Sequence, residues 1–208
     1  MLPENAVIRT EARGFLKGRW GQAILIMVIY CAIMIVLSIP GNQKADKDSF
    51  SFVGDVIFPI ISFVLSGPLA FGIAHYFLSF IRREECEVSQ LFEGFQQFAR
   101  TFITYLLMTV FTVLWALLLI VPGIIASIRY SQTFFILRDN PGMSPREAIK
   151  ESMRLMNGYK MQYFKLGLSF LGWILLGCVT LGIGLLWVLP YIETSLAVFY
   201  QKRIEVTA

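Results

Sequence analysis

Ionisable side chains are rare within the apolar runs of this chain, and two of them could act together. Arg129 follows Gly123 by six residues, and Glu193 follows Gly184 by nine. If both glycines mark turns at the outer surface of a membrane, a helical rise of 1.5 Å per residue puts these charges at depths of ~9 and ~13.5 Å. A lone charge at the membrane centre costs at least roughly 2.5–3.5 kcal/mol, so a partner is expected. The spacing predicts an ion pair, or a polar pocket for an anion, a lipid headgroup or a proton.

Neighbouring residues could complete such a pocket. Tyr130 and Tyr191 lie close to the two charges in sequence and carry hydroxyl groups. Pro190 disturbs the helix that carries Glu193 and frees a backbone carbonyl nearby. Two alternatives need no ligand: a salt bridge that only clips two helical hairpins together, and an arginine that extends to the outer surface. The residues alone favour these simpler interpretations over a binding pocket.

Asp55 and His75 are the other ionisable residues in or near the apolar runs. His75 is the only histidine, and the three cysteines show no paired spacing (Cys31, Cys86 and Cys178). A zinc site therefore lacks ligands, and a disulfide framework is not expected. The sequence also lacks an HExxH motif, a phosphate-binding loop and an evident pairing of a serine with a base. We therefore expect no metal, no cofactor and no enzymatic activity.

The elements that must hold these residues are helices within a membrane. Hydrophobic residues make up 56% of the chain, and the mean hydropathy is +0.66. Six apolar runs cover residues 23–39, 52–80, 102–121, 123–137, 166–181 and 185–200. A transmembrane helix needs about 20 predominantly apolar residues, so apolar runs of this kind indicate membrane spans. The pattern predicts an all-α polytopic membrane protein of one domain, residues 1–208, with six transmembrane helices in three hairpins.

The basic residues fall on one side of this pattern. Fifteen of the 18 Lys and Arg residues lie at the inner ends if the N-terminus is cytoplasmic, whereas the outer segments hold only Lys44 and Lys47. Basic residues resist translocation, so both termini are expected in the cytoplasm. The net charge is +4 and the pI about 9.0. Anionic lipid of the inner leaflet, worth about 1 kcal/mol per basic residue near the surface, explains this charge better than nucleic acid does.

A short amphipathic helix is expected before each hairpin. Ile8, Ala12, Phe15 and Leu16 form an apolar stripe beside the basic stripe Arg9, Arg13 and Lys17, a pattern typical of a helix at the membrane interface. Leu91, Phe92, Phe95, Phe98 and Ala99 repeat this spacing, with Ser89 as a possible cap. Ser144-Pro145-Arg146-Glu147 is a capping box that predicts a third helix start. The units 5–80, 89–138 and 144–201 are either internal repeats or hairpins that share the same requirements.

The second apolar run is unusually long. Residues 52–80 would extend ~43 Å as a helix, against a hydrocarbon core of ~30 Å. Pro68 lies near its middle and removes one backbone hydrogen bond. The run is either one kinked helix or two half-helices that meet within the membrane. The first is favoured because most intramembrane prolines only bend a helix.

Several stretches between residues 60 and 201 resemble a bacterial family of six-span integral membrane proteins that is catalogued as a domain of unknown function. They are Ser66–Leu69, Leu91–Phe95, Leu117–Ile125 (LLLIVPGII), Asp139–Pro141, 148–158 (AIKESMRLMNG), 168–173 (LSFLGW), 180–184 (TLGIG) and Leu189–Tyr191. The family is distantly similar to the membrane domain attached to glycerophosphodiester phosphodiesterases, which is not the catalytic part. The resemblance implies six spans and no assigned chemistry. Family members often have histidine where this chain has Tyr159.

Two functions are compatible with these features. The first is a non-catalytic protein of the bacterial plasma membrane that binds lipid or a membrane partner, in envelope maintenance, export or self-protection. Its partners would be anionic lipids, another membrane protein or a second copy of the chain. The alternative is a small permease whose path runs near the kinked second span, Arg129 and Glu193. No soluble domain or nucleotide site accompanies the spans, which favours the first.

Overall fold

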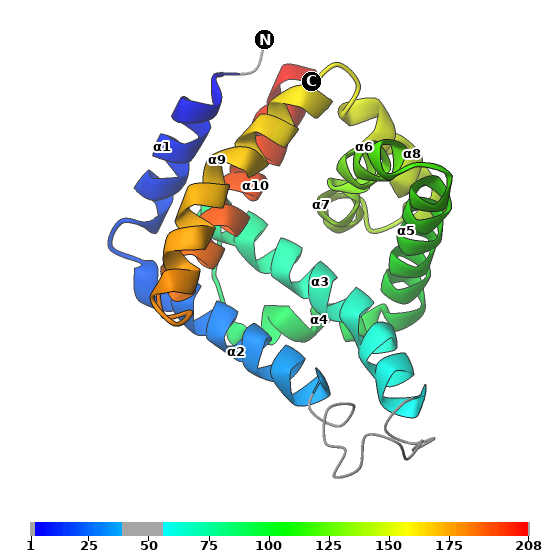
Figure 1. Cartoon of the computed structure of the whole chain (residues 1–208), viewed down its shortest axis with the longest axis horizontal. Helices are drawn as coiled ribbons and strands as arrows, with labels where there is room; N and C mark the ends of the chain where they lie inside the picture. Colours follow the sequence, from blue (N-terminus) through cyan, green and yellow to red (C-terminus); the bar gives the residue numbers. More distant parts are fainter. Residues whose placement is uncertain (1–2, 39–55, 208) are drawn as a thin grey trace.

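The computed structural model describes residues 3–38 and 56–207, and within these ranges all regular structure is helical. Figure 1 shows the helices forming a ring-like bundle with α3 crossing between the two sides. The elements in order are α1 (Asn5–Leu16), α2 (Trp20–Ser38), α3 (Phe58–Arg82), η2 (Val88–Phe92), α4 (Glu93–Gln96), α5 (Phe98–Leu118), α6 (Ile120–Tyr130), α7 (Thr133–Asp139), α8 (Pro145–Leu155), α9 (Lys160–Val179) and α10 (Leu185–Thr207).

Five helical segments are long and apolar enough to cross a membrane. They are Trp20–Leu37, Phe58–Arg82, Phe98–Leu118, Ile120–Asp139 and Lys160–Val179. The sixth predicted run lies in α10, which is a helix of 23 residues. Glu193 and the polar C-terminal segment 201–205 make α10 less apolar than the other five. Five spans are therefore supported by length and composition, and the sixth stays a prediction.

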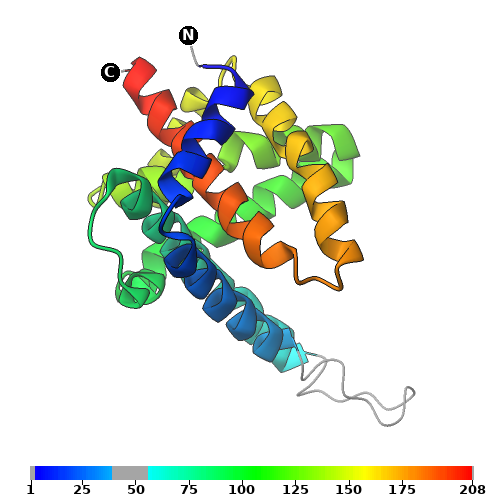
Figure 2. The same ribbon diagram turned by 90° about the vertical axis from the view of Figure 1, so that its left-hand side faces the viewer.

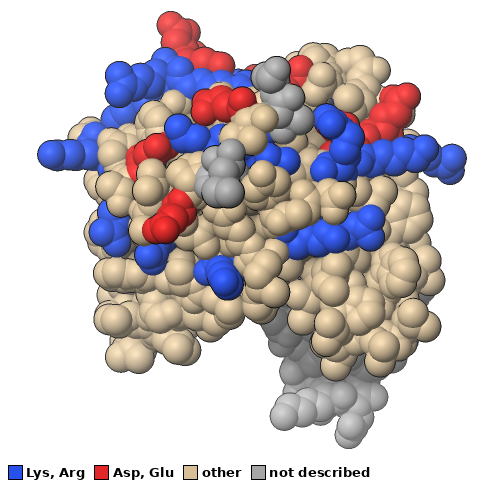
Figure 3. Space-filling view, turned by 90° about the horizontal axis from the view of Figure 1, so that it is seen from above, with Lys and Arg blue, Asp and Glu red and all other residues tan. Residues whose placement is uncertain are grey.

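Two of the interhelical turns lie on one side of the bundle, and the charged side chains gather in another part of its surface. In Figure 2 the corner between α5 and α6 and the turn between α9 and α10 lie on the same side, opposite the C-terminal end of α10. In Figure 3 the visible Lys, Arg, Asp and Glu side chains gather over the upper part of the view, and uncharged residues cover the lower part. The turn between α5 and α6 does not lie at Gly123, where the sequence predicted it. Leu119 alone is extended, and Val121, Pro122 and Gly123 belong to the first turns of α6.

The second apolar run forms one continuous helix around Pro68 within the described residues. The single-helix alternative is thus confirmed for Phe58–Arg82. Its middle is covered by η2 and α4, which pack directly on its backbone. A Cβ atom added at Gly94 would overlap the carbonyl of Pro68, and one at Gly72 would overlap the carbonyl of Leu91. Two of the stretches that carry the family resemblance therefore form one backbone-to-backbone contact.

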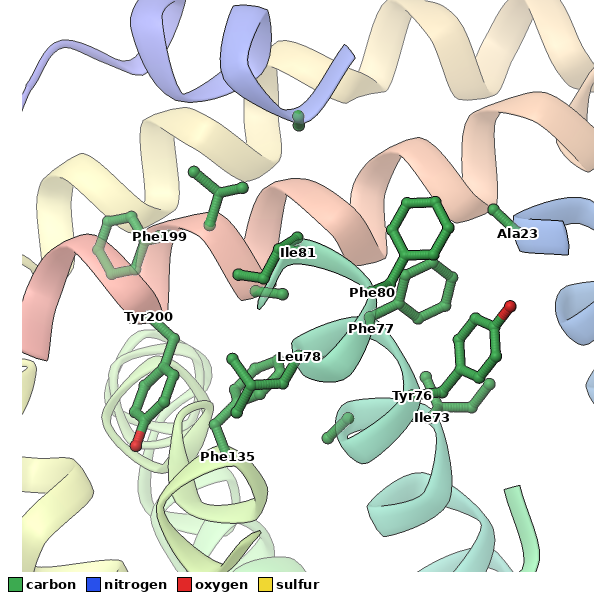
Figure 4. Close-up of a cluster of buried hydrophobic side chains, with 14 of the residues drawn as sticks. Ala23, Ile73, Tyr76, Phe77, Leu78, Phe80, Ile81, Phe135, Phe199 and Tyr200 are labelled. Atoms are coloured by element: carbon green, nitrogen blue, oxygen red, sulfur yellow. The ribbon is translucent and has the colours of Figure 1, made fainter. Parts of the chain in front are cut away.

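The core lies where α3, α7 and α10 meet. Figure 4 shows Leu78, Phe135 and Tyr200 close to one another, one from each of these three helices. The rings of Phe135 and Tyr200 stack with their centroids 5.2 Å apart. Aromatic side chains bury large apolar areas and add geometric preference, so this cluster fixes the relative positions of the three helices.

The amphipathic pattern of α1 suggested that its apolar stripe faces the acyl chains of lipid. In the structure, this stripe is instead buried against protein. Ile8, Ala12 and Leu16 are fully buried, and α1 packs along α10. The stripe is thus satisfied by protein, and the basic stripe lies beside that contact. A periodic pattern reports only that one face is covered, not whether lipid or another helix covers it. Whether α1 lies at the membrane interface stays a prediction.

Of the other two predicted short helices, the one near residue 91 is wrong and the start of the one at Ser144 is confirmed. Residues 88–96 form a 3₁₀-helix followed by a single α-turn, and Ser89 donates to Glu87 instead of capping a helix. The predicted amphipathic helix over 89–99 is therefore wrong, because Phe98 and Ala99 already belong to α5. The capping box is confirmed: the backbone N–H of Glu147 donates to the Ser144 hydroxyl, and the Ser144 N–H donates to the Glu147 carboxylate. Whether the three units are internal repeats stays a prediction.

Candidate functional site

Arg129 and Glu193 are not joined directly. Among the described residues no ion pair within 4.0 Å connects them. Arg129 lies at the end of α6, with its Nε atom buried and without a hydrogen-bond partner. Glu193 lies within α10, where it interacts electrostatically with the phenols of Tyr30 and Tyr163. The structure thus shows no direct pair between the two charges, and a water-bridged pair stays a prediction.

The two flanking tyrosines also lie at different places. The Tyr191 ring packs edge-on against Phe170, with ring centroids 5.1 Å apart, and its hydroxyl donates to the carbonyl of Arg9 at 3.4 Å. Tyr130 instead packs on Phe111 and lines a cavity of about 250 Å³ between α5 and α6. The single pocket predicted around both tyrosines is therefore not what the structure shows, because α6 and α10 present them to different cavities.

His75 has a partner that its position in the sequence does not indicate. Its Nδ1 atom lies 2.6 Å from Oε2 of Glu93, which links α3 to α4. A cavity of about 140 Å³ opens beside this pair and is also lined by Arg100 and Arg138. Burial raises the pKa of the Glu93 carboxyl. Asp55 lies outside the described residues.

The charged end of the bundle holds a polar network in which the side chains bond to one another. Arg82 donates to both carboxylate oxygens of Asp139 at 2.7 Å each, and the Tyr200 hydroxyl donates to the same carboxylate at 3.0 Å. Arg138 pairs with Glu84. Burial opposes the ionisation of Glu84, but the Arg138 guanidinium outweighs it and holds the pKa of that carboxyl below its ordinary value. These contacts tie α3, α7 and α10 together, so we assign the network to structure.

A different pocket combines one free charge with aromatic walls. It has a volume of about 250 Å³ and lies between α1, the start of α2, α9 and α10. The Arg13 guanidinium carbon lies 5.2 Å from the centre of the Tyr191 ring and 5.9 Å from that of Trp173. The remaining lining residues are Trp20, Trp187 and Val188. Three of the four tryptophans of the chain therefore surround one arginine.

Arg13 has no acidic partner in the part of the chain that the structure describes. Its side chain is exposed, and its contacts there are with the two aromatic rings. A guanidinium over an aromatic face keeps the N–H donors at its edge available. The sequence indicated the basic stripe on α1 but not these walls. Trp173 is 160 residues further along the chain, so no local pattern links it to Arg13.

The family model described as "Protein of unknown function (DUF975)" matches residues 1–126 and 116–206. The chain belongs to this family. The two matches together span nearly the whole chain, so the resemblance seen in the motifs is confirmed at family level. No curated protein and no solved structure matches the chain. The family description assigns no chemistry, and the distant likeness to the membrane domain of glycerophosphodiester phosphodiesterases stays a prediction.

Proposed function

We propose that this protein is a non-catalytic integral membrane protein that binds anionic lipid at its inner, basic end, with both termini in the cytoplasm of a bacterial cell. The observation that carries the proposal is the placement of bases without acidic partners beside apolar helices. On α1 and directly after it, the residues Arg9, Arg13 and Lys17 have no ion-pair partner among the described residues. Such bases attract anionic headgroups at about 1 kcal/mol each near the surface.

The exposed apolar surface supports a membrane location. Leu117, Val179 and Leu181 are 79%, 82% and 94% exposed. They belong to a larger exposed apolar set on α5, α6 and α9 that includes Leu118, Leu119, Ile120, Val121, Leu175, Leu176 and Ile183. Monomeric soluble proteins rarely expose contiguous apolar patches of more than a few hundred Å². Lipid satisfies these side chains without a hydrogen-bonding requirement, because the helical backbone bonds internally.

The polar groups favour a binding role over a catalytic one. The charged side chains at the inner end are engaged with one another, as in Arg82 with Asp139 and Arg138 with Glu84. Arg100 donates to the backbone carbonyls of Leu137, Asn140 and Met143. Groups held this way position helices and have little freedom to transfer protons to a substrate.

Thermal unfolding in detergent tests the proposal. Purified protein would be titrated with phosphatidylglycerol or with phosphatidylcholine at equal mole fraction. We expect phosphatidylglycerol to raise the unfolding temperature more, because a ligand bound only by the folded state stabilises it by mass action. The difference should shrink as salt is added, because salt screens exposed charges. Equal effects of the two lipids would overturn the proposal.

A permease is the second candidate, and one observation favours it. Glu193 keeps a partly exposed side chain although it lies among Tyr30 and Tyr163, which come from two other helices. A carboxylate beside tyrosine hydroxyls inside a bundle of apolar helices suits a path for a polar or cationic solute. Saturable uptake of a solute into proteoliposomes, lost in Glu193→Gln and kept in Glu151→Gln, would support this candidate. Uptake that does not saturate would count against it.

A further inference from the structure

We propose that the pocket of Arg13, Trp20, Trp173, Trp187, Val188 and Tyr191 holds one anionic phospholipid. The phosphate would lie on the Arg13 guanidinium and an acyl chain against the tryptophans. This inference rests on the proposed function and deepens it, because it replaces a general attraction to anionic lipid with one seated molecule at a defined place.

The polar end of the site offers hydrogen-bond donors that protein does not use. No carboxylate or carbonyl among the described residues accepts a hydrogen bond from Arg13. Arg9 lies one helical turn earlier, and its Nε atom is buried without a partner. Residues four apart share one face of a helix, so both guanidinium groups can approach the same ligand. A planar guanidinium binds a phosphate through two parallel hydrogen bonds, which makes phosphate the anion that fits it best.

The apolar end continues from the pocket onto the surface of the bundle. Trp173 and Trp187 are 46% and 49% exposed, so each presents one part to the pocket and the other to the surroundings of α9 and α10. A cavity of about 250 Å³ is smaller than the ~300–1,000 Å³ typical of sites that enclose drug-sized ligands. It can therefore seat only part of a lipid, and the rest would extend along exposed apolar side chains such as Leu176 and Val179.

The position of the pocket favours a lipid over a soluble anion. Figure 1 shows α1 and α9 together at one edge of the bundle, and Figure 2 shows α1 lying across α10. The pocket is thus open at the periphery, beside helices whose outer surfaces are apolar. Apart from Arg13 its walls are aromatic or aliphatic, and the Tyr191 hydroxyl already donates to the Arg9 carbonyl. A small hydrated anion would lose water there and gain few donors in return, whereas a phospholipid also buries its acyl chain.

Quenching of tryptophan fluorescence by brominated lipid can test the site directly. Trp115 is the one tryptophan outside the pocket, so Trp115→Phe leaves only the three pocket tryptophans as reporters. Reconstituted Trp115→Phe protein would be titrated with phosphatidylglycerol or phosphatidylcholine brominated on the acyl chains. We expect half-maximal quenching at a roughly tenfold lower mole fraction of phosphatidylglycerol, as for one charge-assisted contact. Equal quenching by the two lipids would overturn the inference.

Two substitutions of Arg13 in the Trp115→Phe background test whether this residue causes the preference for phosphatidylglycerol over phosphatidylcholine. Arg13→Gln should abolish it, and Arg13→Lys should keep part of it because the charge remains without the planar fork. Arg146→Gln is the matched control, since Arg146 is exposed on α8 away from the pocket. A preference that survives Arg13→Gln would overturn the inference, as would its loss in Arg146→Gln. If Arg13→Gln does not fold, the inference is still tested by the Arg13→Lys variant and by the comparison of quenching by the two lipids in the Trp115→Phe protein.

Competition with inorganic phosphate distinguishes a lipid site from a site for a soluble anion. Excess phosphate at constant ionic strength should leave quenching by brominated phosphatidylglycerol unchanged. Relief of quenching at millimolar phosphate would overturn the inference in favour of a soluble anion. The stabilisation by phosphatidylglycerol described under the proposed function depends on all basic residues, so it can persist if this site fails. If phosphatidylglycerol does not stabilise the parent protein more than phosphatidylcholine does, that result counts against the proposed function itself.

Discussion

Arg82 and Asp139 form a two-pronged ion pair, with both N–H···O distances at 2.7 Å, although 57 residues separate them in the chain. The pair joins the end of α3 to the end of α7, and both side chains are largely buried. Arg138 also approaches Asp139, at 3.6 Å. This carboxylate therefore holds the ends of α3, α7 and α10 together.

Removal of either member of this pair should destabilise the protein, and the two removals should not be additive. Arg82→Ala removes the two-pronged partner of a partly buried carboxylate and leaves it only the more distant Arg138 and the Tyr200 hydroxyl. We therefore expect a cost of about 1–3 kcal/mol, between exposed and buried pairs. The double variant with Asp139→Ala should cost less than the sum of the single variants. Thermal unfolding in detergent measures all three. The exposed pair of Arg154 with Glu151 serves as control, and Arg154→Ala should change little. Additive losses at Arg82 and Asp139 would show that the pair contributes no coupling.

The contact between α4 and α3 should not tolerate a side chain at Gly94. A methyl group there would overlap the carbonyl of Pro68, which belongs to backbone and cannot rotate away. Overpacking of this kind typically costs about 1–3 kcal/mol. We therefore expect Gly94→Ala to lower the unfolding temperature clearly.

Gly14→Ala is the matched control for this substitution. Gly14 lies in α1 with open space around it, and alanine favours helix more than glycine does. The control should be neutral or slightly stabilising. Equal unfolding temperatures for Gly94→Ala and the parent protein would contradict the close backbone contact.

The start of α8 should loosen as the pH falls. Hydrogen bonds from the side chain and backbone of Ser144 lower the pKa of Glu147 below its ordinary value. A carboxyl whose pKa is lower in the folded state stabilises that state above its unfolded pKa, and the contribution is lost as the pH falls through the folded pKa. Amide hydrogen exchange at Ser144 and Glu147, corrected for intrinsic rates, should therefore lose protection in the acidic range. Ser144→Ala should lack this protection at neutral pH, and an unchanged profile would contradict the capping role.

Reporter fusions should reveal the orientation of the helices. Alkaline phosphatase is active only after export, so a fusion after Arg154 or at the C-terminus should be inactive, and an insertion within 42–50 should be active. The expectation follows from the fifteen basic residues of the inner segments, which resist translocation. A matched green fluorescent fusion should give the reverse pattern. Phosphatase activity after Arg154 would contradict the proposed topology.

Local patterns determined much of this protein from the sequence alone. Helix α2 is apolar on all sides, so its length and composition alone indicate a span. The Ser144 capping box depends on residues three apart, and its hydrogen bonds form as predicted. The continuous helix around Pro68 follows from the same local physics, since one missing hydrogen bond bends a helix without ending it.

Only the tertiary structure decided which distant side chains meet. His75 faces Glu93 because α4 packs on the backbone of α3, a contact that depends on glycine at two separate positions. Arg13 and Tyr191 meet because the apolar stripe of α1 is covered by α10 and not by lipid. Periodicity shows that a face is buried but not what buries it, and depth along a helix does not determine which way a side chain points. For that reason the similar predicted depths of Arg129 and Glu193 did not suffice to make them a direct ion pair.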